Sequence, residues 1–381
     1  MGIVPSHGPL LTVSSKFSPQ SFFSRTLLSG WGTGTDVDTK FELATRYTLE
    51  VVTSEELRSL FETKTNPTAY IGYEPSGFVH TGQLITSAKI LDLQNAGIGV
   101  TIFLADWHAL INDKVGGKLE NIRACGEYLK ECFLASGVKD TVKFVWASDL
   151  IDHSSYWEKF IRIAKASSLQ RIKRAMTIMG RSDDEAEIDA SKVMYPPMQA
   201  ADIFELGVDI AYAGMDQRRA HMLARDAADK LGWKKPIAIH TPLLVSLQGG
   251  ERMDPVEAKM SKSKPASAVY LHDTPEEITK KIKNAFCPPE IEGNPVLDIA
   301  KLIVFPRTGL LKIDRPVKYG GAIEFKSFDE LAAAYSGGKL HPQDLKIGTA
   351  EALIEILAPV RAHFQKHPAN LDKVKALSVT R

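Results

Sequence analysis

Between residues 69 and 240, short apolar runs alternate with longer segments whose apolar residues recur every three to four positions. The short runs predict buried strands, and the longer segments predict helices that pack on them. Strands are predicted at residues 69–73, 99–104, 142–147, 208–213 and 237–240. Strands that alternate with helices indicate an α/β fold with an open, mostly parallel sheet, which binds ligands at the carboxyl ends of its strands.

Helical spacing continues around these strands. Helices are predicted at residues 39–52, 82–95, 118–134 and 216–231, and one long helix or a helical pair is predicted at residues 155–179. Another is predicted to begin near Thr53, because a capping residue there precedes two acidic residues, Glu55 and Glu56. Pro196 and Pro197 suit the first turn of a further helix.

Beyond residue 287 the pattern is helical, with segments at residues 296–304, 327–335 and 345–364. We therefore predict a Rossmann-like catalytic domain over residues 38–287, with a connective insertion at about 110–190, and a smaller α-helical domain over residues 288–381. Residues 1–35 contain no Asp or Glu and no sustained period. We predict that residues 1–37 are a disordered extension, since their low Arg content does not favour a transit peptide.

Composition narrows the class of protein. The chain has 381 residues, 44% of them hydrophobic, and a net charge of +1, so nucleic acid could bind only at local basic clusters. Its three cysteines, Cys125, Cys132 and Cys287, are too few and scattered for a disulfide framework or a cysteine-ligated zinc site. No apolar run reaches the ~20 residues of a membrane span. We expect a cytoplasmic protein with no membrane partner and no protein-bound metal.

A segment rich in lysine and serine follows a Gly-Gly pair. It consists of Lys259, Met260, Ser261, Lys262 and Ser263. Ammonium and hydroxyl groups in this density suit the oxygens of a polyphosphate. Charge alone would favour an ordinary solvated loop. The ordered string Lys-Met-Ser-Lys-Ser, however, resembles the signature loop of class I aminoacyl-tRNA synthetases.

A second phosphate element lies where the first strand turns into its helix. The N-terminus of a helix presents free N–H groups to an anion. His80, Gly82 and Gln83 occupy this turn, and they resemble the His-x-Gly-His element of the same synthetases. Gln83 replaces the second histidine, and an amide donates a hydrogen bond but carries no charge. We expect His80, Gly82 and Gln83 to contact ATP, although Gln83 departs from the motif.

A group of polar residues predicts a pocket. Tyr195, Gln199 and Asp202 are four and three residues apart, so they share one face of a helix. Burying them unpaired would cost roughly 1–3 kcal/mol each, so a ligand would have to satisfy them. The alternative is a polar stripe on the surface. A second polar set, Gly214, Asp216 and Gln217, follows the strand at 208–213.

With Tyr70 in the first strand, these elements resemble the tyrosyl-tRNA synthetases of the archaeal and eukaryotic type, over about residues 40–365. The resemblance implies that Tyr70 and Asp202 bind the hydroxyl of L-tyrosine. It assigns the ammonium group of the substrate to Tyr195, Gln199 and Gln217. It assigns the ribose of ATP to Gly214 and Asp216.

The resemblance also implies a reaction. Tyrosine is activated by ATP with Mg²⁺ to tyrosyl-adenylate, and the tyrosyl group then passes to the 3′ end of tRNA(Tyr). The catalytic residues would be His80, Lys259 and Lys262, whose charges and donors stabilise the transition state. Tyrosine is favoured over tryptophan because Tyr70 and Asp202 suit a phenol. Two competing hypotheses are a nucleotidyltransferase that uses no transfer RNA and a non-catalytic RNA-binding relative.

Transfer RNA would need surfaces of its own. One basic cluster contains Arg174, and another, directly beside the predicted pocket, contains Arg218 and Arg219. All three are candidate tRNA contacts, and the resemblance assigns Arg174 and Arg218 to the acceptor end. It assigns the anticodon to the C-terminal loops that contain Tyr319, His341 and Asp344, an aromatic and polar set that suits single-stranded bases. Without the resemblance, an ordinary loop and a helix cap would be preferred. The family also implies a homodimer, formed around residues 119–134.

Overall fold

A six-stranded sheet organises the part of the chain that the computed structural model describes, which is residues 36–180, 189–249 and 267–377. The strands are β1 (Glu50–Val52), β2 (Thr68–Tyr73), β3 (Gly99–Leu104), β4 (Lys143–Trp146), β5 (Ile210–Gly214) and β6 (Ile237–Thr241). They lie in the order β1-β6-β5-β2-β3-β4, and β1 alone runs antiparallel to its neighbour. The predicted open, mostly parallel α/β fold is confirmed.

The order of the strands creates a crevice. The chain enters the parallel part of the sheet at β2, continues outward to β3 and β4, and then crosses to β5 and β6 on the other side of β2. Loops that leave β2 and β5 therefore diverge at the carboxyl ends of these two neighbours. Any ligand site of this fold is expected there.

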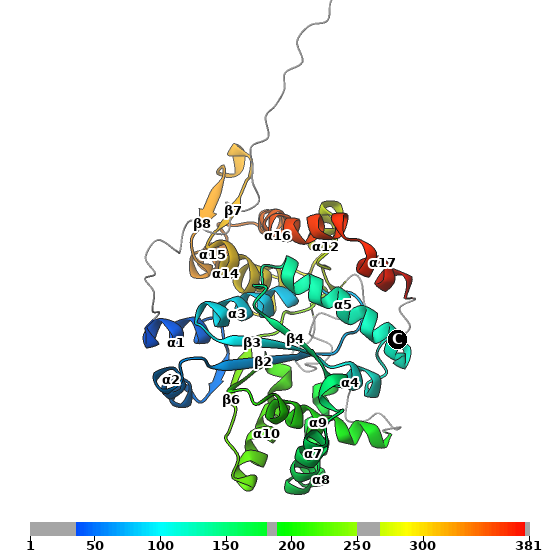
Figure 1. The fold of residues 1–381 in the computed structure, drawn as a ribbon. Helices are drawn as coiled ribbons and strands as arrows, with labels where there is room; N and C mark the ends of the chain where they lie inside the picture. The colour runs from blue at the N-terminus through cyan, green and yellow to red at the C-terminus, as the bar shows by residue number, and fades with distance from the viewer. Residues whose placement is uncertain (1–35, 181–188, 250–266, 378–381) are drawn as a thin grey trace, which may run out of the picture. The chain divides into compact units, whose positions relative to one another are not determined.

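Helices cover both faces of the sheet (Figure 1). One face carries α3 (Gln83–Asn95) and α5 (Leu119–Ala135), and the other carries α7 (Ser154–Ala166), α8 (Leu169–Ala175), α9 (Ala190–Leu206) and α10 (Arg218–Leu231). Side chains alternate between the faces along each strand. In β2, Ile71 joins the core on the α3 side, whereas Tyr70 joins the cluster beside α9. This alternation places Tyr70 on the side of the sheet that holds the predicted pocket residues.

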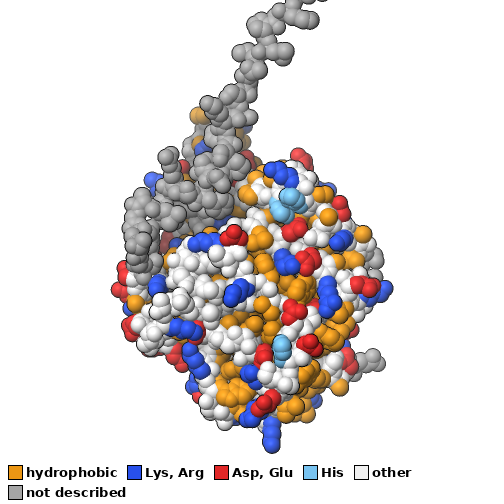
Figure 2. Space-filling view, viewed as in Figure 1, with side chains coloured by type: hydrophobic (Ala, Val, Ile, Leu, Met, Phe, Trp, Pro, Cys, Tyr) orange, Lys and Arg blue, Asp and Glu red, His pale blue; other side chains and the backbone are white. Residues whose placement is uncertain are grey.

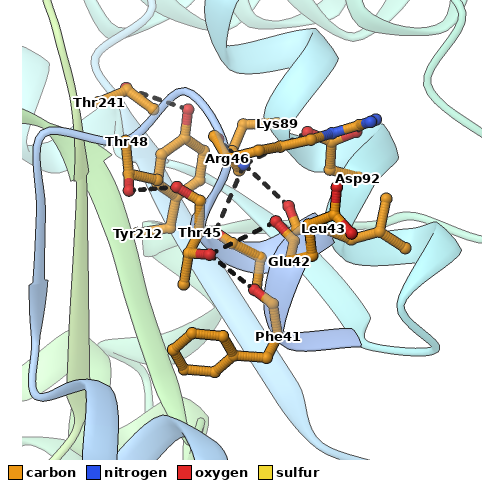
Figure 3. Close-up of polar contacts among 11 residues, drawn as sticks. Phe41, Glu42, Leu43, Thr45, Arg46, Thr48, Lys89, Asp92, Tyr212 and Thr241 are labelled. Carbon is orange, nitrogen blue, oxygen red and sulfur yellow. Dashed lines mark hydrogen bonds and ion pairs between the residues drawn. The ribbon is translucent and has the colours of Figure 1, made fainter. Parts of the chain in front are cut away.

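The segment before the sheet corrects one prediction. The prediction of a helix at residues 39–52 is wrong at its C-terminal end. The observed helix α1 (Val37–Thr45) ends earlier, and residues 50–52 form β1, which pairs with β6. The Lys89 ammonium group donates to the carbonyls of Leu43, Ala44 and Arg46 at this helix end (Figure 3). A buried lysine from α3 therefore satisfies the last carbonyls of α1, which a longer helix would have bonded itself.

Lys89 also fixes an ion-pair cluster. Its side chain is 2% exposed and its Nζ lies 3.3 Å from Asp92, which pairs with Arg46 as well. We expect Lys89→Met to lower the free energy of unfolding by about 3 kcal/mol, because it leaves buried carbonyls and part of a carboxylate unpaired. Urea denaturation measures this loss. Lys280→Met, on the exposed surface of α12 (Pro275–Lys283), should change stability by no more than about 0.5 kcal/mol; equal losses would contradict the role of Lys89.

The helix that carries the predicted pocket residues begins earlier than expected. Pro196 and Pro197 were predicted for its first turn, but α9 starts at Ala190 and both prolines lie inside it. Asp189 caps the helix by accepting from the backbone N–H groups of Ser191 and Lys192. The N-terminus is thus set by a capping carboxylate rather than by the prolines.

The C-terminal region is mainly helical. After α12 it contains α13 (Pro295–Ile299), α14 (Phe305–Thr308), α15 (Phe328–Ser336), α16 (Pro342–Lys366) and α17 (Ala369–Ala376). A hairpin of β7 (Leu311–Ile313) and β8 (Ile323–Phe325) was not predicted. Gly348 in α16 lies against Ile313, since a Cβ atom there would come within 2.6 Å of that side chain. One buried core runs from the sheet into these helices, and the domain boundary at residue 287 stays a prediction.

Charges of both signs are interspersed over the face of the molecule in Figure 2. This distribution agrees with the net charge of +1. Among the helices of the described ranges, none combines the length and apolar character that a bilayer span requires.

Candidate active site

A cavity of about 970 Å³ opens at the carboxyl ends of β2 and β5, in the crevice that the strand order creates. Many predicted site residues line it: Tyr70, His80, Gly82, Gln83, Tyr195, Gln199, Asp202, Gly214, Asp216 and Gln217. The predicted lysine loop, Lys259 to Ser263, lies outside the described residues. The fold therefore brings together side chains that are up to 147 positions apart in the sequence.

The inner end of the cavity is built around the Asp202 carboxylate. Asp202 is 1% exposed, and it accepts a hydrogen bond of 3.0 Å from the Tyr156 hydroxyl. The Nε2 atom of His108 lies 3.2 Å from its other oxygen. Burial lowers the pKa of His108, but the contact with Asp202 and the charges of Asp202, Glu74 and Asp106 together raise it overall. His108 and Tyr156 were not among the predicted site residues.

Tyr70 shares this end of the cavity. Its ring is 1% exposed, and burial, followed by the nearby charge of Asp202, raises the pKa of its hydroxyl. The phenol therefore stays neutral at physiological pH and keeps a hydrogen to donate. A substrate hydroxyl placed here would meet one phenol and one carboxylate.

A second carboxylate, Glu74, stands further out, directly after β2. It accepts hydrogen bonds from the Tyr195 hydroxyl at 2.8 Å and from Asn112 Nδ2 at 3.0 Å. The Lys114 ammonium group lies 3.4 Å away. Glu74 therefore already has one cation, Lys114, as a neighbour in the cavity wall. Glu74 lines the cavity but was not among the predicted site residues.

Two amides complete this region. Gln199 donates through Nε2 to Gln217 Oε1 at 3.2 Å, and Gln217 donates to the backbone carbonyl of Ile178 at 3.0 Å. These bonds orient both side chains. Gln199 Oε1 is buried and accepts no hydrogen bond from any described residue. A buried acceptor that has no donor in this part of the chain suits a donor group of a ligand, such as an ammonium group.

The turn before α3 is shaped for an anion. Gly82 donates its backbone N–H to His80 Nδ1 at 3.1 Å, and a Cβ atom on Gly82 would lie 2.7 Å from the His80 ring. Since Nδ1 accepts, the neutral ring carries its proton on Nε2. The Nε2 atom of Gln83 is buried, with no acceptor among the described residues. The turn therefore offers an amide donor at a helix N-terminus.

The chain that follows the predicted lysine loop lies beside this turn. Thr81 N–H donates to the Val269 carbonyl at 2.8 Å, and Leu271 N–H donates to the Val79 carbonyl at 2.9 Å. Tyr270, between these two, lines the cavity.

Gly214 and Asp216 form another part of the wall. A Cβ atom at Gly214 would lie 2.7 Å from Leu243 and 2.8 Å from the Asp216 carboxylate. A larger residue at this position would therefore force Leu243 or the Asp216 carboxylate to move. Within the described ranges, no three His, Cys, Asp or Glu side chains are grouped so that they could hold a metal ion.

The predicted contacts to transfer RNA lie outside the cavity. Arg174, Arg218 and Arg219 are exposed, and Arg219 donates to the Arg174 carbonyl at 2.9 Å, so these two are neighbours. In the C-terminal region, Tyr319 follows β7 and is 60% exposed. His341 caps α16, whose first turn contains Asp344.

A chain of polar contacts leads from the exposed Arg218 side chain to two buried histidines. Its guanidinium pairs with both oxygens of Glu50 at 2.7 and 2.8 Å, and Glu50 lies 3.0 Å from His240 Nδ1. His240 Nε2 then lies 3.0 Å from His221 Nδ1. Burial, followed by the charge of His240, lowers the pKa of His221 to about 3.

This histidine predicts a pH dependence of stability. An unfolded histidine has a pKa of about 6.5, so between pH 6.5 and 3 the unfolded chain binds the additional proton. The free energy of unfolding should therefore fall as the pH falls, by up to about 1.4 kcal/mol per pH unit from this group. Urea denaturation at pH 7, 6 and 5 should show a shallower fall for His221→Leu. Parallel slopes for the two proteins would contradict the prediction.

Comparison with known proteins agrees with the geometry. Residues 62–358 match the family model described as tRNA synthetases class I (W and Y). A tyrosine–tRNA ligase of Saccharolobus islandicus is 48% identical over 354 residues, which cover 90% of this chain and 98% of that protein. This chain belongs to the class I tyrosyl-tRNA synthetases. The family suggested by the sequence motifs is confirmed.

Solved tyrosyl-tRNA synthetases have the same fold. The structure from Aeropyrum pernix is 45% identical, with a TM-score of 0.82, over 91% of this chain and all of the other. The structure from Pyrococcus horikoshii, complexed with L-tyrosine, is 43% identical, with a TM-score of 0.84, over 90% of this chain and all of the other. The archaeal type predicted from the sequence is thus the type of these relatives.

Proposed function

We propose that this tyrosyl-tRNA synthetase activates L-tyrosine with ATP and transfers it to tRNA(Tyr), as a tyrosine–tRNA ligase. The observation that carries the proposal is the polarity of the cavity. A buried hydroxyl-binding pair, Tyr70 and Asp202, closes its inner end, and a second carboxylate, Glu74, stands further out. These groups match the phenol and the ammonium of tyrosine.

The remaining end of the substrate would face the anion-binding turn. With the phenol at Asp202 and the ammonium group at Tyr195, Gln199, Gln217 and the added Glu74, the carboxylate of tyrosine points toward His80 and Gln83. There, one carboxylate oxygen attacks the α-phosphorus of ATP. A bond forms between this carboxylate oxygen and the α-phosphorus, which gives the adenylate. The bond between the α-phosphorus and the bridging oxygen breaks, and pyrophosphate leaves with that oxygen.

The protein's contribution to this step is positioning and charge. The N–H of His80 and the Gln83 amide donate to phosphate oxygens, and Asp216, beside Gly214, holds the ribose hydroxyls. Lys259 and Lys262 neutralise the leaving pyrophosphate. Mg²⁺ enters as part of the nucleotide substrate. No nucleophilic side chain is required, because the substrate carboxylate is the nucleophile.

Transfer RNA contacts form the second part of the proposal. Arg174, Arg218 and Arg219 would contact the acceptor end, because they are exposed guanidinium groups on and beside α10, the helix that follows Gln217. The exposed Tyr319 ring, with His341 and Asp344, would read the anticodon. The chain would act in the cytoplasm as a homodimer that packs through residues 119–134, and sedimentation analysis tests this assembly.

ATP–pyrophosphate exchange with each amino acid tests the main proposal. Exchange that depends on tyrosine supports it. Exchange that depends on tryptophan would assign the other amino acid of the family model, and a lack of exchange with every amino acid would favour a non-catalytic RNA-binding relative.

The predicted lysine loop has its own test. We expect Lys262→Ala to lower the rate of adenylate formation about 100-fold or more, because one of the positive charges that stabilise the leaving pyrophosphate is removed. Tyrosine binding should change little, since the ammonium and phenol contacts lie elsewhere. Rapid-quench kinetics and calorimetric titration separate the two steps. Equal losses in both measurements would contradict the role of Lys262.

A further inference from the structure

The Asp202 carboxylate is held on both sides before any substrate binds. The Tyr156 hydroxyl donates to Oδ1, and the His108 ring lies against Oδ2. All three side chains are at most 1% exposed. Among the described residues, no lysine or arginine pairs with Asp202, so these two neighbours supply its polar support within the protein.

We propose that Tyr156 and His108 are positioning residues that set the selectivity for a substrate hydroxyl by fixing the orientation of the Asp202 carboxylate. This inference rests on the proposed function, which places the phenol of tyrosine at Asp202. Tyr156 does not line the cavity, so it acts through Asp202 rather than by touching the substrate.

The two residues come from different elements. Tyr156 belongs to α7, which packs on α9 beside Asp202. His108 belongs to α4 (Asp106–Ile111), and its ring packs edge-on against Tyr195 at 4.9 Å and against Phe103 at 6.1 Å between ring centroids. Neighbouring rings therefore restrict the rotation of His108. A carboxylate held from two elements presents its remaining lone pairs in one direction.

Selectivity depends on this rigidity. When phenylalanine occupies the pocket, the carboxylate lacks the hydroxyl partner, and the cost is high only if Asp202 cannot turn toward another partner. Without Tyr156 or His108, Asp202 can rotate. The hydrogen bond to tyrosine then weakens and the penalty for phenylalanine shrinks. The ratio of the two activities therefore falls.

Substitutions that remove only the polar contact test this inference. Tyr156→Phe keeps the ring and deletes the hydroxyl. His108→Leu replaces the imidazole and both of its nitrogens with an apolar side chain, whereas His108→Gln keeps a polar N–H group that can face Asp202. The measured quantity is the ratio of kcat/KM for tyrosine to that for phenylalanine in ATP–pyrophosphate exchange.

We expect the ratio to fall about tenfold or more in Tyr156→Phe and His108→Leu, mainly through a higher KM for tyrosine. It should stay within about threefold of the parent value in His108→Gln. Tyr128→Phe is the matched control, because it deletes a buried hydroxyl that lies 3.0 Å from His272 Nδ1, away from the cavity lining. That variant should leave the ratio unchanged.

The outcomes distinguish a positioning role of Tyr156 and His108 from a purely structural role. If Tyr156→Phe lowers the activity with both amino acids equally, or lowers only the thermal stability, its role is structural and the inference is wrong. If His108→Leu does not fold, the isosteric Tyr156→Phe still decides. If the parent enzyme shows no tyrosine-dependent exchange, the proposed function fails instead.

Discussion

Asp202→Asn is expected to lower kcat/KM for tyrosine roughly 10- to 100-fold. A hydrogen bond to a charged acceptor contributes about 1.5–3 kcal/mol, and each 1.4 kcal/mol is about tenfold in rate. Asparagine keeps the volume of the side chain and removes the charge. Activity with phenylalanine should stay level or rise, since an amide costs less than a carboxylate when it has no partner. ATP–pyrophosphate exchange with both amino acids measures the two effects.

Asp298→Asn provides a control for this substitution. Asp298 lies in α13, where burial raises the pKa of its carboxyl to about 6, and it does not line the cavity. The change should leave the selectivity unaltered. If Asp202→Asn lowered the activity with tyrosine and phenylalanine to the same extent, the phenol would not bind at Asp202.

Glu74→Gln is expected to weaken tyrosine binding about 10-fold or more. Glu74 faces the Lys114 ammonium group at 3.4 Å and accepts from Tyr195 and Asn112. The proposed role gives it the substrate ammonium as a further partner, and a neutral amide would lose the charge-assisted part of that contact. Calorimetric titration with L-tyrosine measures the loss.

A ligand without the amino group distinguishes this role from general damage. 3-(4-Hydroxyphenyl)propionate retains the phenol and the carboxylate. It should bind the parent protein and Glu74→Gln with affinities within about threefold of each other. A similar loss for both ligands would show that the substitution disturbs the pocket rather than the ammonium contact.

Local sequence patterns predicted most elements of the sheet. The run at residues 99–104 agrees with β3 at both ends, and the other parallel strands agree within two residues. β2, β3, β5 and β6 have the apolar runs that burial on both faces requires, whereas β4 is a half-exposed edge strand. The pattern did not predict β1, because this strand has only three residues and is too short to form an apolar run of its own. It also failed at the β7–β8 hairpin, where each strand has three residues.

The site was predicted where chemistry recurs at short spacing. Tyr195, Gln199 and Asp202 share one helix face, and all three line the cavity. Glu74 and His108 were missed although a signal existed: each is a polar residue at the carboxyl end of a parallel strand, or just beyond it, where ligands bind. Tyr156 had no such signal, because a tyrosine in an amphipathic helix suggests only a core position.

Local spacing and side-chain chemistry determined the alternation of strands and helices and the polar cluster of Tyr195, Gln199 and Asp202. The class of the protein and the groups proposed to bind a phenol, an ammonium group and a phosphate were inferred from the resemblance of its motifs to a known family. Only the tertiary structure decided that the Asp202 carboxylate is held by Tyr156 and His108, and that Lys89 ends α1. Such contacts join residues between 43 and 94 positions apart, because packing brings distant segments together and no local period records which of them meet.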